Sequence, residues 1–223
     1  MIADKVSFGS YTAEGELTLI SQEEYKLVTS SVEAAPPDPV TKTVEVPGRD
    51  GELDFTEALD GRVHYNPRKI SMEFYSFGED EELPELERNC INTLHGKKMR
   101  IYLDADPEYY YLGRLSVSWK YGENLDTVSI EAECDPYKYK RQETVCGYDV
   151  EGSLAVSLEN TGWMPVSPLI EADSEMQILF GNTSAVLSPG AQKVPGLVLA
   201  RGSTALTVKG TGRIQFAYRE GAL

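Results

Sequence analysis

The residues that most suggest chemistry lie in one stretch, Pro47 to Gly61, with the sequence PGRDGELDFTEALDG. It holds three glycines, one proline and five acidic residues in fifteen positions. Dense carboxylates suit a hard cation, glycines beside an arginine suit a phosphate, and the same residues suit a sharply turned hairpin. The residue types alone leave an ion-binding loop, a phosphate cradle and a hairpin open.

Two shorter motifs also resemble ion or phosphate sites. KGTGR at 209–213 has loop glycines, but it lacks the spaced Gly-Lys-Ser/Thr of a phosphate loop and no helix is predicted after it. DADPE at 104–108 offers three carboxylates, but it lacks the longer ligand series and the glycine of a calcium loop. We therefore predict a hairpin turn in the first motif and a solvated turn in the second.

Residues for catalysis are sparse. The two histidines are His64 and His95, and we predict that His95 caps the end of a helix. No Ser or Cys lies in a G-x-S-x-G pattern, and Cys90, Cys134 and Cys146 are too scattered for a zinc site or a disulfide framework, so we predict reduced thiols. We predict no enzyme: no catalytic residue, no metal and no cofactor. A glycosidase stays as a less favoured alternative, because carboxylate pairs are spaced in the fold and not in the sequence.

The charge of the chain argues against nucleic-acid binding. The formal net charge is −15, of which −14 falls in residues 1–138 and −1 in residues 139–223. Such an acidic surface repels phosphate backbones. Trp119, Trp163 and thirteen tyrosines can stack on sugars, so a glycan-binding module for cell-wall attachment is the alternative function, although most aromatic residues of a sandwich lie in its core.

The elements that must position these residues are mostly strands. Alternating apolar residues and turn signals predict a mainly β chain. Proline crowding at 34–40 excludes a central strand there, so we predict an extended arm over about residues 34–69. The strands that we expect in the first part of the chain are residues 15–20, 41–46, 70–77, 97–103, 109–119 and 127–133.

One helix is predicted, over residues 84–95. Pro84 suits its first turn, Gly96 suits its end, and Leu86, Cys90 and Leu94 recur on one face that must pack on a sheet. The helix belongs to an N-terminal domain, residues 1–138, that we expect to resemble a β-sandwich.

A second domain, residues 139–223, is predicted as a small β-sandwich because glycines and prolines punctuate short strands. Its clearest element is TALTVKGTGRIQFAY, residues 204–218, for which we predict a hairpin with its turn at Lys209–Gly212. The side chains that we expect to face inward are Leu206, Val208, Ile214, Phe216 and Tyr218.

The chain start and the uncharged stretches predict no membrane insertion. The first ten residues, MIADKVSFGS, lack the apolar region of a signal peptide, and the uncharged stretch from Met176 to Gln192 is interrupted by Gly, Asn, Ser and Pro. We expect neither secretion by a signal peptide nor a membrane span.

The order of these features resembles the distal tail protein (Dit) family of long-tailed, siphovirus-type bacteriophages and related prophage tail components. The resemblance is carried by TVEVPGRDGELDFTEALDGRVHYNPRKISMEF, then a helix, then KKMRIYLDADPEYYYLGRL and IEAECDPYKYK. The C-terminal NTGWMPVSPLIEADSEMQILFGN and GLVLARGSTALTVKGTGRIQFAYREGAL are similar to the second, galectin-like domain of the family.

The resemblance implies a virion structural protein. Such a protein forms a sixfold ring that caps the tail tube and serves as baseplate hub for tail-tip and receptor-binding proteins, while DNA passes through a central channel without specific binding. The N-terminal domain forms the ring, and the protein is assembled in the bacterial cytoplasm and ends at the virion tail tip. Residues 139–223 leave no room for the carbohydrate-binding insertion of some members, so adhesion is expected from a partner.

In this context the opening motif is the bend of an arm that reaches a neighbouring subunit. Glycines 48, 51 and 61 are predicted turn residues, Arg49 and Asp50 lie at the tip, and Asp54 to Thr56 begin the return. The residues that we assign to this contact are Val46, Pro47, Gly48, Arg49, Asp50, Gly51, Asp54, Thr56, Tyr65 and Arg68.

Overall fold

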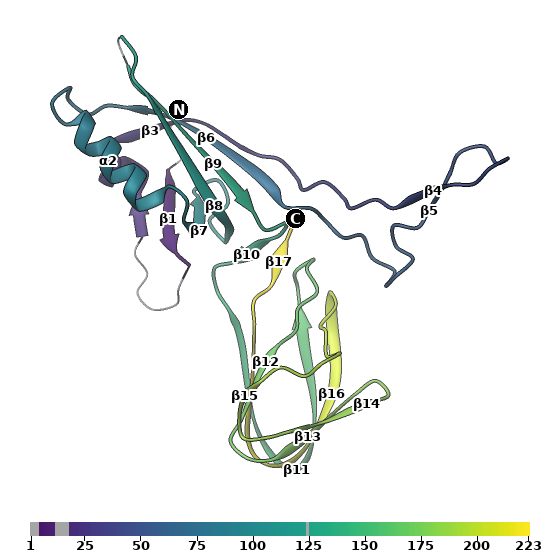
Figure 1. Cartoon of the computed structure of the whole chain (residues 1–223). Helices are drawn as coiled ribbons and strands as arrows, with labels where there is room; N and C mark the ends of the chain where they lie inside the picture. Colours follow the sequence, from purple (N-terminus) through teal and green to yellow (C-terminus); the bar gives the residue numbers. More distant parts are fainter. Residues whose placement is uncertain (1–4, 12–17, 124) are drawn as a thin grey trace. The chain divides into compact units, whose positions relative to one another are not determined.

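Strands make up most of the regular structure in this computed structural model, which describes residues 5–11, 18–123 and 125–223. The predicted mainly β fold is confirmed. The chain divides into unit 1, residues 1–136, and unit 2, residues 137–223, and each unit has its own hydrophobic core (Figure 1).

Unit 1 is built on one antiparallel sheet with the strand order β2-β1-β7-β8-β9-β6-β3. Four predicted strands are confirmed, and the described part of a fifth, 15–20, is β2; residues 15–17 lie outside the described residues. The strands β1 and β3 were not predicted. The bounds are β1 (Val6–Ser10), β2 (Thr18–Ile20), β3 (Leu27–Ala34), β6 (Arg68–Ser76), β7 (Lys98–Leu103), β8 (Tyr109–Lys120) and β9 (Thr127–Cys134).

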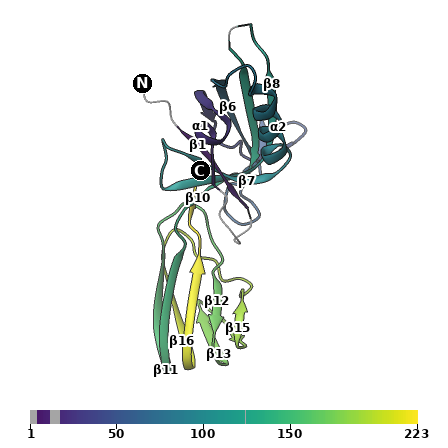
Figure 2. The same ribbon diagram turned by 90° about the vertical axis from the view of Figure 1, so that its left-hand side faces the viewer.

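Strict alternation places the core of unit 1 on one side of this sheet. In β6, Ile70, Met72 and Phe74 are buried, whereas the residues between them are exposed. The predicted helix is confirmed as α2 (Leu83–Leu94), which buries Cys90 and Leu94 in this core and covers the sheet (Figures 1 and 2). A short helix that was not predicted, α1 (Ser21–Tyr25), also lies in unit 1.

The end of α2 combines the two predicted stop signals. Gly96 has a φ of +76°, a left-handed conformation that favours glycine. His95 is the C-cap residue, as predicted, and its ring Nδ1 also accepts a hydrogen bond of 3.1 Å from the backbone N–H of Val117 in β8. The imidazole therefore fastens the end of the helix to the sheet.

Unit 2 is a second antiparallel arrangement with the strand order β14-β13-β16-β12-β15, and β11 pairs with β16 (Figure 2). The short strands β10 and β17 pair with each other. The bounds are β10 (Lys138–Lys140), β11 (Thr144–Asn160), β12 (Leu169–Ala172), β13 (Met176–Phe180), β14 (Thr183–Leu187), β15 (Gly190–Gln192), β16 (Gly202–Tyr218) and β17 (Gly221–Ala222).

The hairpin predicted at residues 204–218 is wrong, because β16 runs unbroken through the predicted turn. It pairs with β11 over its whole length, and Gly210 lies opposite Gly152. The five predicted inward side chains are all buried. The glycines serve close approach instead of a turn: a Cβ on Gly210 would lie 2.9 Å from Cγ of Met176, and Gly210 has a φ of +144°.

The close approach of Gly210 to Met176 predicts that a side chain at position 210 destabilises unit 2. Gly210→Ala should lower the free energy of unfolding by about 1–3 kcal/mol, because alanine is strained at this φ and its methyl group meets the buried Met176. Urea denaturation measures the change. Gly147→Ala in β11 is the matched control and should stay within about 0.5 kcal/mol, since its Cβ would meet only Arg213 at 3.7 Å. Equal stabilities would contradict the explanation.

A buried carboxylate ties the two ends of unit 2 together. Glu220, only 3% exposed, accepts hydrogen bonds of 2.8 Å from both the backbone N–H and the hydroxyl of Thr161, and it pairs with the ammonium of Lys140. Burial raises the pKa of Glu220, but the hydrogen bonds from Lys140 and Thr161 lower it by more than burial raises it. The pKa of Glu220 therefore lies below its ordinary value near 4.5. The charged form of Glu220 therefore stabilises the fold.

The sign of the shift fixes a pH dependence. A depressed pKa contributes stability above the ordinary value near 4.5, and this stability is lost as the pH falls through the lower, folded value. Glu220→Gln should therefore be less stable at pH 7 and should lose less stability on acidification than the wild type. Urea denaturation between pH 7 and pH 3 measures both effects, with the exposed Glu159→Gln as control. Parallel pH profiles for Glu220→Gln and wild type would contradict the assignment.

Candidate interaction site on the arm

The candidate site is an arm, residues 35–67, that leaves the sheet of unit 1 between the neighbouring strands β3 and β6 (Figure 1). Its stem is held by backbone pairing of its two chains. The N–H of Val40 donates to the carbonyl of His64 at 2.8 Å, and the N–H of Asn66 donates to the carbonyl of Asp38 at 2.8 Å. Pro39 and Tyr65 form a β-bridge between these two bonds. The stem is therefore extended, as proline crowding predicted.

The outer part of the arm is a hairpin of β4 (Thr43–Glu45) and β5 (Glu52–Asp54). The backbone N–H of Arg49 donates to the carbonyl of Val46 at 3.1 Å, which closes the turn. Gly48 and Gly51 have φ values of +82° and +74°, which glycine adopts without strain. The tip holds Arg49 and Asp50 as predicted, but the return strand already begins at Glu52.

The chain leaves β5 through a turn that Asp54 organises. The Oδ1 of Asp54 accepts a hydrogen bond of 2.8 Å from the N–H of Thr56, and the Thr56 hydroxyl accepts one of 3.1 Å from the N–H of Lys42 on the opposite chain. The Thr56 donors hold the pKa of Asp54 below its usual value. Both residues were predicted as parts of the contact, and the structure shows that they also shape the arm.

A second exposed cluster follows along the returning chain. The carboxylate of Asp60 accepts from Arg62 Nη2 at 2.9 Å and contacts His64 Nε2 at 3.1 Å. The guanidinium of Arg62 lowers the pKa of Asp60. Gly61, between the two charged residues, has the predicted positive φ, +72°.

The hairpin has two chemically different faces, and the register decides which side chains share one. Val44 lies directly opposite Leu53. Val46 and Phe55 each lie one residue beyond the end of β4 or β5, and the same alternation, continued by that residue, puts them on the side of Val44 and Leu53. The N–H of Phe55 donates to the carbonyl of Lys42 at 2.7 Å, which continues the pairing. Val44, Val46 and Phe55 are 51%, 38% and 45% exposed, and Leu53 is half-buried. We call these four residues the arm apolar face.

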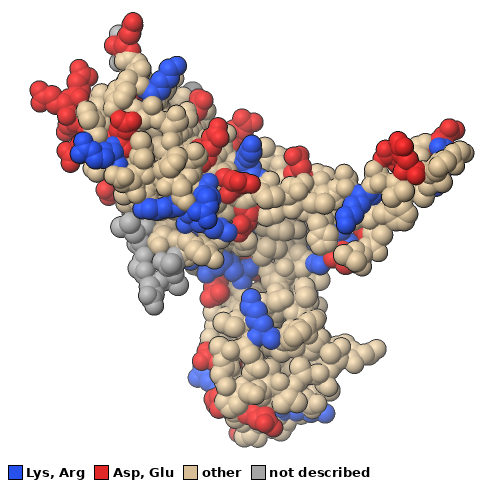
Figure 3. All heavy atoms as spheres, in the orientation of Figure 1, with Lys and Arg blue, Asp and Glu red and all other residues tan. Residues whose placement is uncertain are grey.

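The opposite side of the hairpin is acidic. Its residues are Thr43, Glu45, Glu52 and Asp54, all exposed. Figure 3 shows acidic side chains gathered along one edge of the arm, with uncharged atoms over much of the rest. The sequence analysis assigned Val46 to the contact but missed Val44, Leu53 and Phe55. Their alternation along the chain could have indicated them, but it shows a shared face only when the pairing register of β4 and β5 is known.

Arg68 occupies a different environment from the other assigned residues. It is the first residue of β6 and is buried, with its Nη2 donating to the carbonyl of Ala34 at 3.2 Å and its guanidinium 5.0 Å from the centre of the Tyr111 ring. Within the described residues, its Nε and Nη1 have no hydrogen-bond acceptor. Because Ala34 ends β3, Arg68 joins the two chains at the root of the arm.

The arm tip does not suit an ion or a phosphate. A hollow of about 330 Å³ at the tip is lined by Glu45, Val46, Pro47, Arg49, Gly51 and Glu52. One arginine faces two carboxylates there, so the hollow favours neither an anion nor a cation. In the described part of the chain, no group of three or more His, Cys, Asp or Glu residues is arranged to hold a metal. Of the three initial interpretations of this stretch, the hairpin is the one that the geometry supports.

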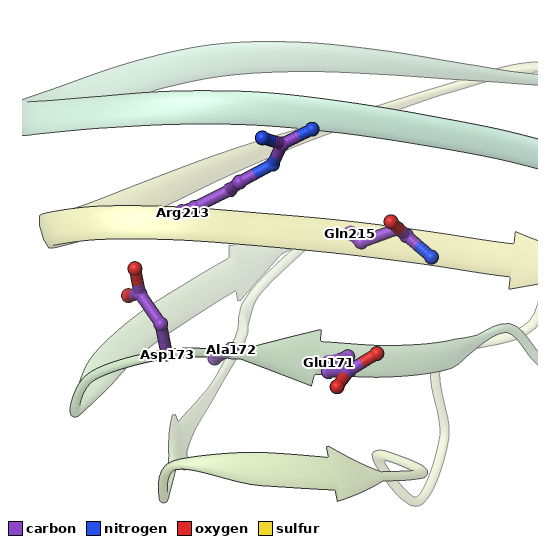
Figure 4. Close-up of a pocket in the computed structure, with 5 residues that line it drawn as sticks. All are labelled: Glu171, Ala172, Asp173, Arg213 and Gln215. Atoms are coloured by element: carbon purple, nitrogen blue, oxygen red, sulfur yellow. The ribbon is translucent and has the colours of Figure 1, made fainter.

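Unit 2 offers two weaker surface features. A hollow of about 260 Å³ is lined by Glu171 and Asp173 beside Arg213 and Gln215 of β16 (Figure 4). Trp163 is 63% exposed, and the guanidinium of Arg201 lies 3.5 Å from the centre of its ring. A sugar could therefore stack only on the other face of the Trp163 ring.

Among the described residues, no helix has both the length and the apolar character needed to cross a membrane.

The fold described so far consists of two β-rich units, one of which carries a covering helix and an arm. The crystal structure of the Dit protein of phage SPP1, described as a paradigm of the hub adsorption apparatus in phages that infect Gram-positive bacteria, matches with a TM-score of 0.67 at 17% identity, over 97% of this chain and 98% of that chain. A chain of the phage P2 baseplate in its activated conformation with Ca matches with a TM-score of 0.51 at 9% identity, over 97% and 98%.

These matches show a shared fold over nearly the whole chain, and the Dit-like fold that the sequence resemblance implied is confirmed. No protein-family model matches the chain, and no curated protein matches it significantly.

The geometry of the arm predicts a local effect of Asp54. Asp54→Ala should speed amide hydrogen exchange at Thr56 and its neighbours, because it removes the 2.8 Å acceptor of the Thr56 N–H, while the melting temperature of unit 1 stays unchanged. Asp54→Asn keeps an oxygen acceptor and is the control. Hydrogen exchange read by mass spectrometry separates the variants, and identical exchange in all three would show that the bond does not hold the turn.

Proposed function

We propose that this chain is a structural protein of a phage tail tip, which forms a sixfold ring with copies of itself and serves as a hub. The observation that carries the proposal is the match to the SPP1 Dit fold over 97% of the chain, with an arm whose apolar face is exposed in the part of the unit that the structure describes. In this proposal the ring caps the tail tube protein and holds the tail-tip and receptor-binding proteins.

The arm supports self-assembly on physical grounds. A two-stranded ribbon is marginally stable in water, and a sheet with one apolar face must bury that face against another element. Contacts between two different surfaces of identical chains generate rings when the rotation closes. We propose that the arm residues assigned from the sequence, with Arg68 holding the root, form such a contact.

The charge supports a channel through which DNA passes without specific binding. Residues 1–138 carry most of the net charge of −15, and acidic side chains gather around the start of α2 in Figure 3. Duplex DNA carries about one charge per 1.7 Å, so an acidic lining would repel it. In this proposal the protein is not an enzyme; it is assembled in the bacterial cytoplasm and ends in the virion.

Self-assembly is tested on the purified chain and on one deletion. The wild type should sediment as a species of six times the 24.7 kDa chain mass, and negative-stain images should show rings. Deleting residues 35–66 and joining β3 to β6 by a short glycine-serine turn should leave a folded monomer, because these strands are antiparallel neighbours.

The matched control is a chain with the arm intact and the exposed Val186 of β14 changed to Ser, which should still form rings. Rings from the deletion variant would show that the arm is not needed. Tail tips imaged without this protein would contradict the proposed function itself.

A further inference from the structure

The sheet of unit 1 carries a second uncovered apolar surface, far from the arm in the fold. Tyr75, Phe77 and Leu125 are 42%, 49% and 48% exposed. Ser76 is buried between Tyr75 and Phe77, and its N–H donates to the carbonyl of Asp126 at 3.0 Å, which brings these two chain segments side by side. We call Tyr75, Phe77 and Leu125 the sheet-end patch.

The side chains of the patch point away from the core. In β6 the even-numbered residues are buried, so Tyr75 lies on the outer face of the sheet and Phe77 continues that alternation. Asp126 is buried and accepts from Nε1 of Trp119 at 3.0 Å and from the N–H of Gly122 at 3.0 Å. The β6–β9 register, in which Tyr75 lies opposite Thr127, places Leu125 opposite Phe77 when it is continued by two residues.

The arm cannot reach the patch of its own chain. The arm begins at the Arg68 end of β6, and the patch lies at the Ser76 end. Nine residues of strand separate the two ends by about 30 Å, and the arm extends away from the sheet beyond the Arg68 end (Figure 1). The arm and the patch therefore lie at opposite ends of β6, which suits a head-to-tail arrangement in which the arm of one copy meets the patch of the next.

The two surfaces match in geometry. The arm apolar face has side chains two residues apart on each of two paired strands, and the patch has Tyr75 and Phe77 two residues apart with Leu125 on the neighbouring segment. Both surfaces therefore lie at the ends of antiparallel strand pairs and share the two-residue spacing of side chains on one face, and two such faces pack about 10 Å apart.

The charges around the two surfaces are complementary. By register, Lys42 lies on the same side of the arm as the apolar face, and Arg49 is at the tip. Around the patch, Glu73 precedes Tyr75 on the outer face of β6, and Glu79 and Asp80 follow Phe77. Two cations also lie nearby: Lys120 is opposite Thr127, and Lys26, whose carbonyl accepts from the N–H of Phe77, pairs with Glu82. The four carboxylates named here outnumber these two cations. Opposite charge at the rim of an apolar contact fixes its orientation.

We propose that the arm apolar face of one copy docks on the sheet-end patch of the next copy. The proposal rests on the proposed self-assembly and adds the surface that receives the arm. Each copy gives one arm and receives one arm, so an arm–patch contact repeats around the ring.

Two variants test the proposal on the full-length chain. The arm variant is Val44→Ser with Phe55→Ser, and the patch variant is Tyr75→Ser with Phe77→Ser. Each buried aromatic side chain should contribute about tenfold to about a hundredfold to the association constant, so both variants should be monomeric where the wild type assembles. Sedimentation velocity measures assembly, and circular dichroism verifies that each variant is folded.

The controls change exposed residues outside the two surfaces. Glu45→Ser with Glu52→Ser alters the acidic side of the arm, and Val186→Ser removes an exposed apolar side chain of β14. Neither control removes apolar contact area from the arm apolar face or the patch. Both should keep an association constant within a few-fold of the wild type.

Mixing the two variants gives the sharpest outcome. The arm variant keeps an intact patch, and the patch variant keeps an intact arm. An equimolar mixture should therefore form a pair of one copy of each, and no ring, because the other end of each pair is defective. Native mass spectrometry resolves this pair from either variant alone when the two carry different isotope labels.

Three results would overturn the proposal. Assembly of the patch variant with the affinity of the wild type would show that another surface of the neighbouring copy, such as its own arm, covers the arm. Rings from both variants would show that neither surface is needed for assembly, and the proposed function would not be affected. A wild type that stays monomeric at its highest soluble concentration would also overturn it, and the proposed function would then be judged by imaging tail tips.

Discussion

One constraint governs the arm of this protein: a hairpin of two strands has no second layer of structure that could bury its apolar face. Val44 and Leu53 face each other across the hairpin, and the other members of the arm apolar face, Val46 and Phe55, are also apolar. The sheet of unit 1 solves the same problem internally, because α2 and seven strands enclose Phe74 and Leu94. In the described part of unit 1 the arm apolar face stays exposed, so the stability of the hairpin depends on whatever surface covers this face.

Much of the fold could be predicted because local chemistry and tertiary structure agree. The alternation of β6 and the proline and glycine at the ends of α2 are local signals, and the structure uses each as expected. The failure at β16 has a physical cause: glycine serves both tight turns and close packing. The inward positions keep the same parity from Leu206 to Tyr218, with Gly210 and Gly212 among them, and that unbroken parity already favoured one strand.

The candidate site was predicted in outline only. Prolines and turn glycines located the arm and its tip, because backbone restrictions act within a few residues. Its apolar face could not be assigned, because Val44 and Phe55 share a side only through the register with which β4 meets β5. The patch depends on two segments about fifty residues apart, Tyr75 and Leu125, that meet in the sheet. Long-range pairing of this kind leaves no local signal.

The prolines of the stem have a consequence for how an exposed arm behaves in solution. Pro36, Pro37 and Pro39 have no backbone N–H, so one edge of the stem cannot donate the ladder of hydrogen bonds that another strand would need. An exposed ribbon without such prolines is a template for open-ended growth into fibres. Over residues 36–39 the stem is therefore limited mostly to contacts through its side chains, which disfavours edge-to-edge aggregation there.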